Sequence, residues 1–93
     1  MSYKMYRLWD YSTLERKENL SSFESFHLHK YGDELRKEFP KSQYFWRDGA
    51  YCWYTDETQS RIQSVYLLVN GVCCFRDFTI NGKPKVYKVE FNF

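Results

Sequence analysis

Residues 65–93 read VYLLVNGVCCFRDFTINGKPKVYKVEFNF and contain Asn-Gly twice, at 70–71 and 81–82. Asn-Gly between β-rich runs is typical of the two-residue type I′ turn, because both central residues of that turn take a positive φ. The stretch therefore predicts three antiparallel strands joined by two tight hairpins. Asp48-Gly49, between the β-rich runs 44–47 and 50–54, predicts another such hairpin. Everything after Pro40 is expected to form sheet.

The first 40 residues predict a strand followed by one or two helices. Residues 3–10 alternate in polarity, as a strand does. Ser12 and Glu15 have the spacing of a capping box, which predicts a short helix through Glu18. Residues 21–24 repeat this pattern and open a longer helix over 22–39, which Gly32 could divide in two. Its expected apolar side consists of Phe23, Phe26, Tyr31, Leu35 and Phe39.

These elements predict one α+β domain over residues 1–93. An N-terminal strand and one or two helices precede a five-stranded antiparallel meander, and a helix packs across one face of the sheet. The arrangement resembles that of the cystatins at the level of architecture. The Gln-x-Val-x-Gly loop and the Pro-Trp hairpin that carry cystatin function are absent from the sequence, so the resemblance implies no activity.

The two Asn-Gly turns also predict which residues face each other. Two-residue turns set Val69 opposite Val72 and Ile80 opposite Lys83, and each strand then alternates between two faces. The expected core face comprises Val65, Leu67, Val69, Val72, Cys74, Phe78, Ile80, Tyr87, Val89, Phe91 and Phe93, with Arg76 as an intruder. The opposite face then places Tyr66 across from Phe75 and Leu68 across from Cys73.

An apolar patch with charged residues around it is typical of a partner site. Lys88, Glu90 and Asp77 surround the predicted patch, which makes it a candidate surface for a partner or for self-association. The alternative is that the curled sheet, the N-terminal strand or the loop 55–60 covers it. In the hairpin 43–54, Tyr44, Trp46, Tyr51 and Trp53 share one side and form either core or binding surface. The candidate partner-binding residues are Tyr66, Phe75, Leu68, Lys88, Phe45, Arg47 and Tyr54.

Charge and composition exclude several classes of protein. The net charge of +2 is too small for a general nucleic-acid binder, so nucleic acid is an unexpected partner. No apolar run approaches the ~18 residues of a membrane span, and the N-terminus lacks the apolar region of a signal peptide. Three cysteines, two of them adjacent, do not form a disulfide framework, so we expect reduced, buried thiols. A soluble, intracellular, cytoplasmic protein is expected.

No motif for metal, cofactor or catalysis emerges. His27 and His29 point about 200° apart on a helix and cannot share a metal ion there, and no Cys or His spacing completes a zinc site. We therefore expect neither metal nor cofactor. The enzymatic alternative is a small metal-independent ribonuclease of the toxin type, for which Arg47, Arg61, Arg76 and Tyr87 are the candidates. A single-stranded nucleic-acid binder, with rings on a sheet face, is a third alternative.

The sequence thus favours a non-enzymatic protein-binding module. Its chain is 22% aromatic with nine tyrosines, and Tyr and Arg are frequent in interface hot spots. We expect it to dock an aromatic sheet surface onto another protein, or onto a second copy of itself, and to act by steric blocking. A compact inhibitor of a host complex, such as bacteriophages and mobile elements encode, fits this size and composition.

Overall fold

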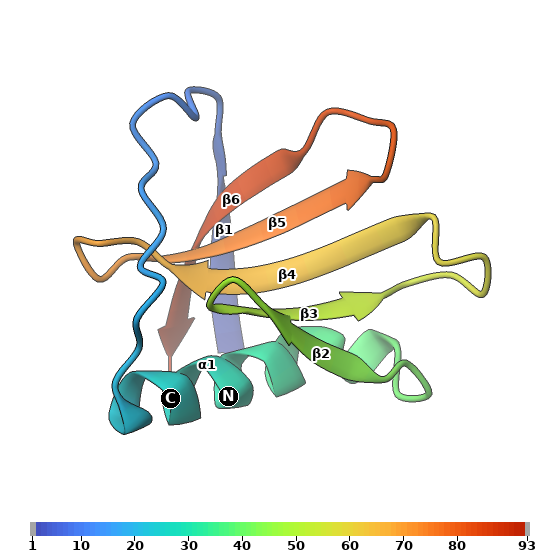
Figure 1. The fold of residues 1–93 in the computed structure, drawn as a ribbon, viewed down its shortest axis with the longest axis horizontal. Helices are drawn as coiled ribbons and strands as arrows, with labels where there is room; N and C mark the ends of the chain where they lie inside the picture. The colour runs from blue at the N-terminus through green and yellow to red at the C-terminus, as the bar shows by residue number, and fades with distance from the viewer. Residues whose placement is uncertain (1, 93) are drawn as a thin grey trace.

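A computed structural model describes residues 2–92 and has an α+β fold (Figure 1). The elements are β1 (Ser2–Leu8), α1 (Ser22–Leu35), a 3-10 helix η1 (Arg36–Glu38), β2 (Tyr44–Arg47), β3 (Ala50–Tyr54), β4 (Arg61–Leu67), β5 (Cys73–Thr79) and β6 (Lys85–Asn92). The strands form one antiparallel sheet in the order β1-β6-β5-β4-β3-β2. The predicted meander and the helix across one face are confirmed. The sheet has six strands rather than five, because β1 pairs with β6.

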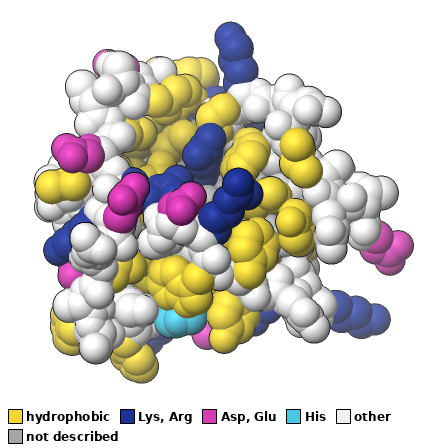
Figure 2. Space-filling model, in the orientation of Figure 1, with side chains coloured by type: hydrophobic (Ala, Val, Ile, Leu, Met, Phe, Trp, Pro, Cys, Tyr) yellow, Lys and Arg dark blue, Asp and Glu magenta, His cyan; other side chains and the backbone are white. Residues whose placement is uncertain are grey.

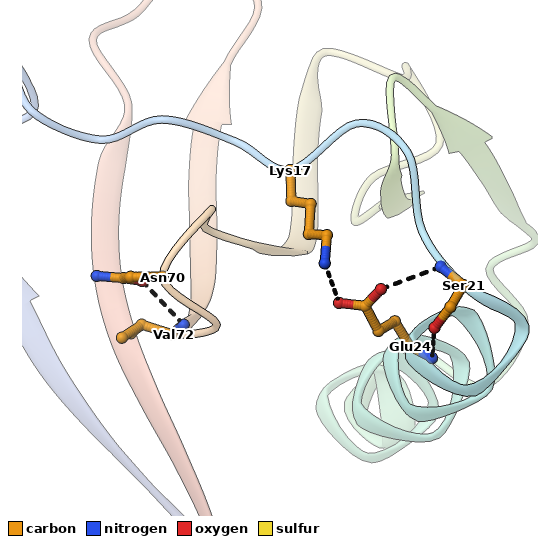
Figure 3. A network of polar contacts seen from close by, with 5 residues as sticks. All are labelled: Lys17, Ser21, Glu24, Asn70 and Val72. Atoms are coloured by element: carbon orange, nitrogen blue, oxygen red, sulfur yellow. Dashed lines mark hydrogen bonds and ion pairs between the residues drawn. The ribbon is translucent and has the colours of Figure 1, made fainter.

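Helix α1 begins where the sequence predicts and remains a single α-helix. Ser21 caps it: the Ser21 hydroxyl accepts a hydrogen bond from the Glu24 amide, and the Glu24 carboxylate accepts one from the Ser21 amide (Figure 3). The helix runs through Gly32 and tightens into η1 ahead of Pro40. Its buried residues are Leu28, Gly32 and Leu35. The prediction that Phe23 and Phe26 face the core is wrong, since both are exposed.

No helix forms over residues 12–18. The segment 9–21, which we call the strap, runs in extended form past the β4–β5 loop (Figure 1). The Lys17 amide donates to the Leu67 carbonyl at 2.8 Å, and the Val69 amide donates to the Glu15 carbonyl at 2.9 Å. The Ser12 hydroxyl donates to Asp10 instead of capping a helix. The strap's backbone thus pairs with the end of β4, and this pairing replaces the hydrogen bonds of a helical turn.

The Asp48-Gly49 hairpin has the predicted two-residue turn. Asp48 and Gly49 have φ values of 53° and 76°, and Arg47 pairs with Ala50. These positive values at both central positions are those of a type I′ turn.

The Asn70-Gly71 hairpin does not have the predicted register. Its loop contains three residues: the Leu68 amide donates to the Val72 carbonyl, and the Gly71 amide donates to the Leu68 carbonyl. Gly71 has a φ of 88°, as in a type I turn closed by a left-handed residue. Leu67 therefore pairs with Cys73, not with Cys74. A shift of one residue turns every β5 side chain to the opposite face.

The Asn81-Gly82 hairpin is also one residue away from the prediction, because Asp77 rather than Phe78 pairs with Lys85. The two shifts cancel between β4 and β6, whose faces are as predicted, and only β5 is inverted. Cys73 and Phe75 lie on the face that α1 covers, whereas Cys74 and Phe78 lie on the other. The prediction that Tyr66 faces Phe75 is therefore wrong. Phe93, also predicted for the core, lies outside the described residues.

Two apolar clusters fill the two faces. The cluster between sheet and helix contains Leu28, Leu35, Tyr51, Trp53, Val65, Leu67, Cys73, Phe75 and Val89. The cluster on the opposite face contains Ala50, Cys52, Ile62, Tyr66, Leu68 and Cys74, with Leu14 of the strap packed against it. Because helix and strap occupy opposite faces, both sides of the sheet centre are covered.

Candidate functional site

The seven predicted partner-binding residues do not form one exposed patch. Tyr66, Leu68 and Phe75 are at most 6% exposed. Phe75 lies beneath α1, and the strap lies over the other two, where the Arg16 guanidinium is 4.7 Å from the Tyr66 ring centroid. The alternative that the predicted patch is covered therefore describes these three residues, although the cover is α1 for Phe75 and the strap for Tyr66 and Leu68.

The other four candidates share the face opposite α1. Phe45, Tyr54 and Lys88 are half-buried and Arg47 is exposed. Three of them, Phe45, Arg47 and Tyr54, line a hollow of about 440 Å³ over β2–β5, which we call the arginine groove. Its remaining lining residues are Arg16, Asp48, Ala50, Cys52, Ile62, Ser64, Arg76, Phe78 and Ile80. Figure 2 shows Lys and Arg side chains beside hydrophobic ones in the centre and upper part of the view.

Three guanidinium groups in the arginine groove are not paired with a carboxylate of the described residues. The five ion pairs among residues 2–92 include neither Arg16 nor Arg47 nor Arg76. Arg16 donates to the Asp48 carbonyl at 3.3 Å, and Arg76 lies 4.6 Å from the Phe78 ring centroid. The Arg76 Nε is buried and has no hydrogen-bond partner among residues 2–92. The groove is thus a cationic hollow with an apolar floor.

Cys52 lies in the floor of this groove as a neutral thiol. Burial raises its pKa to about 11, Asp48 acts in the same direction, and the positive charges of the three arginines act against burial without overcoming it. A thiol with such a pKa is a poor nucleophile at neutral pH, because the thiolate is the reactive form. Cys73 and Cys74 are likewise buried, and they lie on opposite faces, as predicted.

A second surface presents aromatic side chains from α1 and β2. We call it the aromatic surface: Phe23, Phe26, His29, Tyr44 and Trp46. Phe23 and Phe26 both contact the His27 ring, at centroid distances of 4.3 and 5.7 Å. His29 contacts the rings of Tyr44 and Trp46 on β2. The Trp46 Nε1 donates to the His29 Nε2 at 2.8 Å, which joins β2 to the helix. Figure 2 shows hydrophobic side chains around a histidine in the lower part of the view.

The rings of β2 are exposed but held in place. Trp46 is 37% exposed and Tyr44 is 48% exposed. Tyr44 stacks on the buried Tyr51 ring at 4.7 Å and 12°, and the Arg36 guanidinium lies 5.3 Å from the Tyr44 ring centroid. The Tyr51 hydroxyl donates to Asp33, and burial together with this bond raises the Tyr51 pKa. The hairpin 43–54 is therefore core on β3 and surface on β2.

The residues proposed for a ribonuclease are split between the two faces. Arg47 and Arg76 lie in the arginine groove. Arg61 lies on the helix side and binds both carboxylate oxygens of Asp77 at 2.9 and 2.6 Å. The Tyr87 hydroxyl, also on that side, accepts from Arg7. The structure therefore does not bring these four residues together.

The rest of the described chain offers a second hollow but no cluster of metal ligands. Residues 2–92 contain no group of three His, Cys, Asp or Glu side chains suited to a metal ion. A wider hollow of about 850 Å³ lies between the loops 39–45 and 54–59, and it shares the rings of Phe45 and Tyr54 with the arginine groove. Its Asp56 carboxylate is occupied with hydrogen bonds from Thr58 and Ser60 within the loop.

Sequence reasoning missed the roles of Arg16, Phe23 and Phe26. The apolar side of α1 follows the spacing Leu28, Gly32, Leu35, and a glycine in that series conceals the pattern. Arg16 carries no local signal, since its position depends on the pairing of the strap with β4. Comparison with protein-family models, with curated proteins and with solved structures finds no match to this chain. No helix within residues 2–92 is long and apolar enough to cross a membrane.

Proposed function

We propose that this protein is a non-enzymatic protein-binding module that docks its aromatic surface onto another protein. The observation that carries the proposal is the pair of exposed rings on β2, Tyr44 and Trp46, which the fold already holds in place through Tyr51 and His29. Tyr and Trp dominate interface hot spots. Rings that are ordered before binding lose little conformational entropy when a partner covers them.

The position of β2 supports the same use. β2 is an edge strand that pairs with β3 alone, so its other side offers backbone donors and acceptors. A partner strand added along this edge would lie beside Tyr44 and Trp46, and recognition of this kind combines backbone hydrogen bonds with side-chain contacts. Exposed Phe23 and Phe26 extend the apolar area along α1.

The proposal changes the residues expected to bind. Tyr66, Leu68 and Phe75 stabilise the two clusters, while Arg47 points to the face opposite Trp46 and lies outside the aromatic surface. With a net charge of only +2, steric blocking of the partner is a better mechanism than charge mimicry. Steric blocking of this kind is how an inhibitor of a larger complex would act.

The test is capture from an extract of the source cell on immobilised protein, followed by mass spectrometry. The variant Tyr44→Ser/Trp46→Ser should lose the captured protein. The matched control, Val69→Ser/Ile80→Ser, removes two exposed apolar side chains from other loops and should keep it. Circular dichroism checks that both variants fold. Equal capture by wild type and the β2 variant would overturn the proposal.

A second copy of the chain is the other partner to test for the aromatic surface. Sedimentation of the purified protein at increasing concentration measures self-association directly. If a dimer forms and the β2 variant abolishes it while the control variant does not, the partner on this edge is another copy. If neither a dimer nor a specific captured protein appears, the aromatic surface has no protein partner.

A further inference from the structure

The arginine groove lies on the face opposite α1 and is independent of the aromatic surface. Arg16 comes from the strap, Arg47 from β2 and Arg76 from β5, so residues 31 and 29 positions apart converge on one hollow. Burying or crowding like charges is costly without counter-charge. Asp48 is the one acidic residue among the described residues that line the hollow, and it cannot neutralise three guanidinium groups.

We propose that the arginine groove binds a nucleotide unit, with its phosphate on Arg16, Arg47 and Arg76 and its base against the rings of Tyr54 and Phe45. Guanidinium groups pair with phosphate oxygens through parallel N–H···O bonds. These three arginines make no ion pair in the described part of the chain. The Arg76 Nε is itself buried and makes no hydrogen bond to a described residue, so a phosphate would be bound through the terminal nitrogens of this guanidinium.

The rings of the groove favour a base-bearing ligand over a bare anion. Tyr54 and Phe45 stand together with ring centroids 5.3 Å apart, and Phe78 lines the hollow near Arg76. Aromatic side chains next to a basic groove are the usual way in which proteins hold single nucleotides of a strand without reading the sequence. A volume of about 440 Å³ lies within the range of small-ligand pockets and suits one unit rather than a duplex.

An acidic peptide is the competing anionic ligand, and the backbone disfavours it. The floor of the groove comes from β3, β4 and β5, which all lie inside the sheet and are paired on both sides. The backbone groups of these three strands are therefore not open to an added peptide strand, and only β2, at the rim of the groove, has an open edge. A nucleotide needs only the charges and rings that the groove presents.

The small net charge of the whole chain is compatible with this site. Five carboxylates elsewhere in residues 2–92 are paired with basic residues, which balances the total without neutralising the groove. The groove is a local cluster of positive charges, whereas the net charge is the sum over all charged residues of the chain. A site for one nucleotide unit does not require the basic stripe of a general nucleic-acid binder.

The test measures fluorescence anisotropy with a labelled eight-nucleotide single strand and calorimetry with adenosine monophosphate. Saturable binding of either probe is expected, and Arg47→Gln/Arg76→Gln should weaken it at least tenfold. The control Lys30→Gln/Lys37→Gln removes the same charge from the α1 side and should change binding less than twofold. For the single strand, neutralisation of one phosphate predicts a slope of log K against log salt of about −0.7, which the groove variant should flatten.

A ring substitution separates nucleotide binding from simple anion binding. Tyr54→Leu keeps an apolar side chain and should weaken the nucleotide about tenfold, as loss of one stacking ring does. Inorganic phosphate should bind wild type and Tyr54→Leu alike. Binding of the monophosphate alone assigns a free nucleotide, and binding of the strand alone assigns single-stranded nucleic acid; either supports the proposal.

Several results would overturn it. One is that neither probe binds saturably at concentrations up to about 1 mM, which is on the order of the dissociation constant of the weakest specific complexes. Another is an equal loss in the control variant, which would show attraction to net charge only. Tighter binding of a hexaglutamate peptide than of the single strand would assign the groove to an acidic protein segment. Arg47→Gln alone, at an exposed position, keeps the test valid if the double variant fails to fold.

Discussion

The ring of Tyr51 occupies the space that a side chain at Gly32 would need. A Cβ placed on Gly32 would lie 2.1 Å from the Tyr51 Cδ1 and 2.5 Å from its Cε1. Tyr51, on β3, is fully buried beneath α1. Its hydroxyl donates a hydrogen bond to Asp33, the residue after Gly32 in the helix. Gly32 therefore lets the helix approach the sheet closely, which explains a glycine in the middle of α1.

Gly32→Ala should destabilise the fold. Helix propensity alone would favour alanine by about 1 kcal/mol. Overpacking against the buried ring costs about 1–3 kcal/mol, and an overlap at 2.1 Å belongs at the upper end, so we expect a net loss of about 2 kcal/mol. Urea unfolding measures it. In a double-mutant cycle, Tyr51→Leu should reduce the cost of Gly32→Ala; additive effects would contradict the packing explanation.

Replacing Tyr66 and Phe75 by serine should unfold the protein rather than expose a binding defect. The two rings lie in different clusters on opposite faces, and each is nearly fully buried. Large-to-small changes at buried aromatic sites cost about 3–5 kcal/mol each, and a small domain has only about 5–15 kcal/mol in total. Circular dichroism and thermal melting give the readout. A folded double variant with a wild-type melting temperature would disprove this assignment.

The fold was largely predictable because turn and capping signals are local. The Ser21–Glu24 capping box and the Asp48-Gly49 turn depend on residues next to each other, and both occur as predicted. Asn70-Gly71 was misread because the same dipeptide also fits a three-residue loop, in which glycine takes the left-handed position. The predicted position of Arg76 on the core face already pointed to a different register. A shift of β5 by one residue places Phe75 on that face and Arg76 on the opposite one.

The candidate site was less predictable because it depends on long-range pairing. The strap meets β4 through hydrogen bonds between residues about 50 positions apart, such as Lys17 with Leu67. That contact covers Tyr66 and brings Arg16 to the groove, and no local pattern encodes it. The exposed rings of α1 were missed for a related reason. Five apolar residues over 22–39 predict one face, but the sheet contacts the face that contains Gly32.

The three cysteines should resist alkylation in the folded protein. All are free and buried, and burial raises the pKa of each thiol, to about 11 for Cys52 and Cys74. Since the thiolate is the nucleophile, iodoacetamide at pH 7.5 should label none rapidly in native protein and all three in urea. Mass spectrometry counts the adducts. Thr13→Cys, at an exposed strap position, provides a thiol that should react at once. Fast native labelling of Cys73 would contradict its burial.

The ion pair between Lys17 and Glu24 should make stability depend on pH in the acid range. The Glu24 carboxylate accepts from the Lys17 ammonium at 2.7 Å and from the Ser21 amide at 3.0 Å, so the strap is tied to the start of α1 (Figure 3). These bonds lower the Glu24 pKa from 4.5 to about 2, with the Lys17 bond as the larger cause.

A pKa that is lower in the folded state than in the unfolded state stabilises the fold above the unfolded value. This contribution should be fully present above about pH 5 and should be lost as the pH falls from about 4.5 toward 2. Urea midpoints of wild type should therefore decline through this range more steeply than those of Glu24→Gln. Glu57→Gln, which removes an exposed carboxylate from the β3–β4 loop, is the control and should keep the wild-type slope. Parallel curves for wild type and Glu24→Gln would show that this ion pair does not contribute to stability.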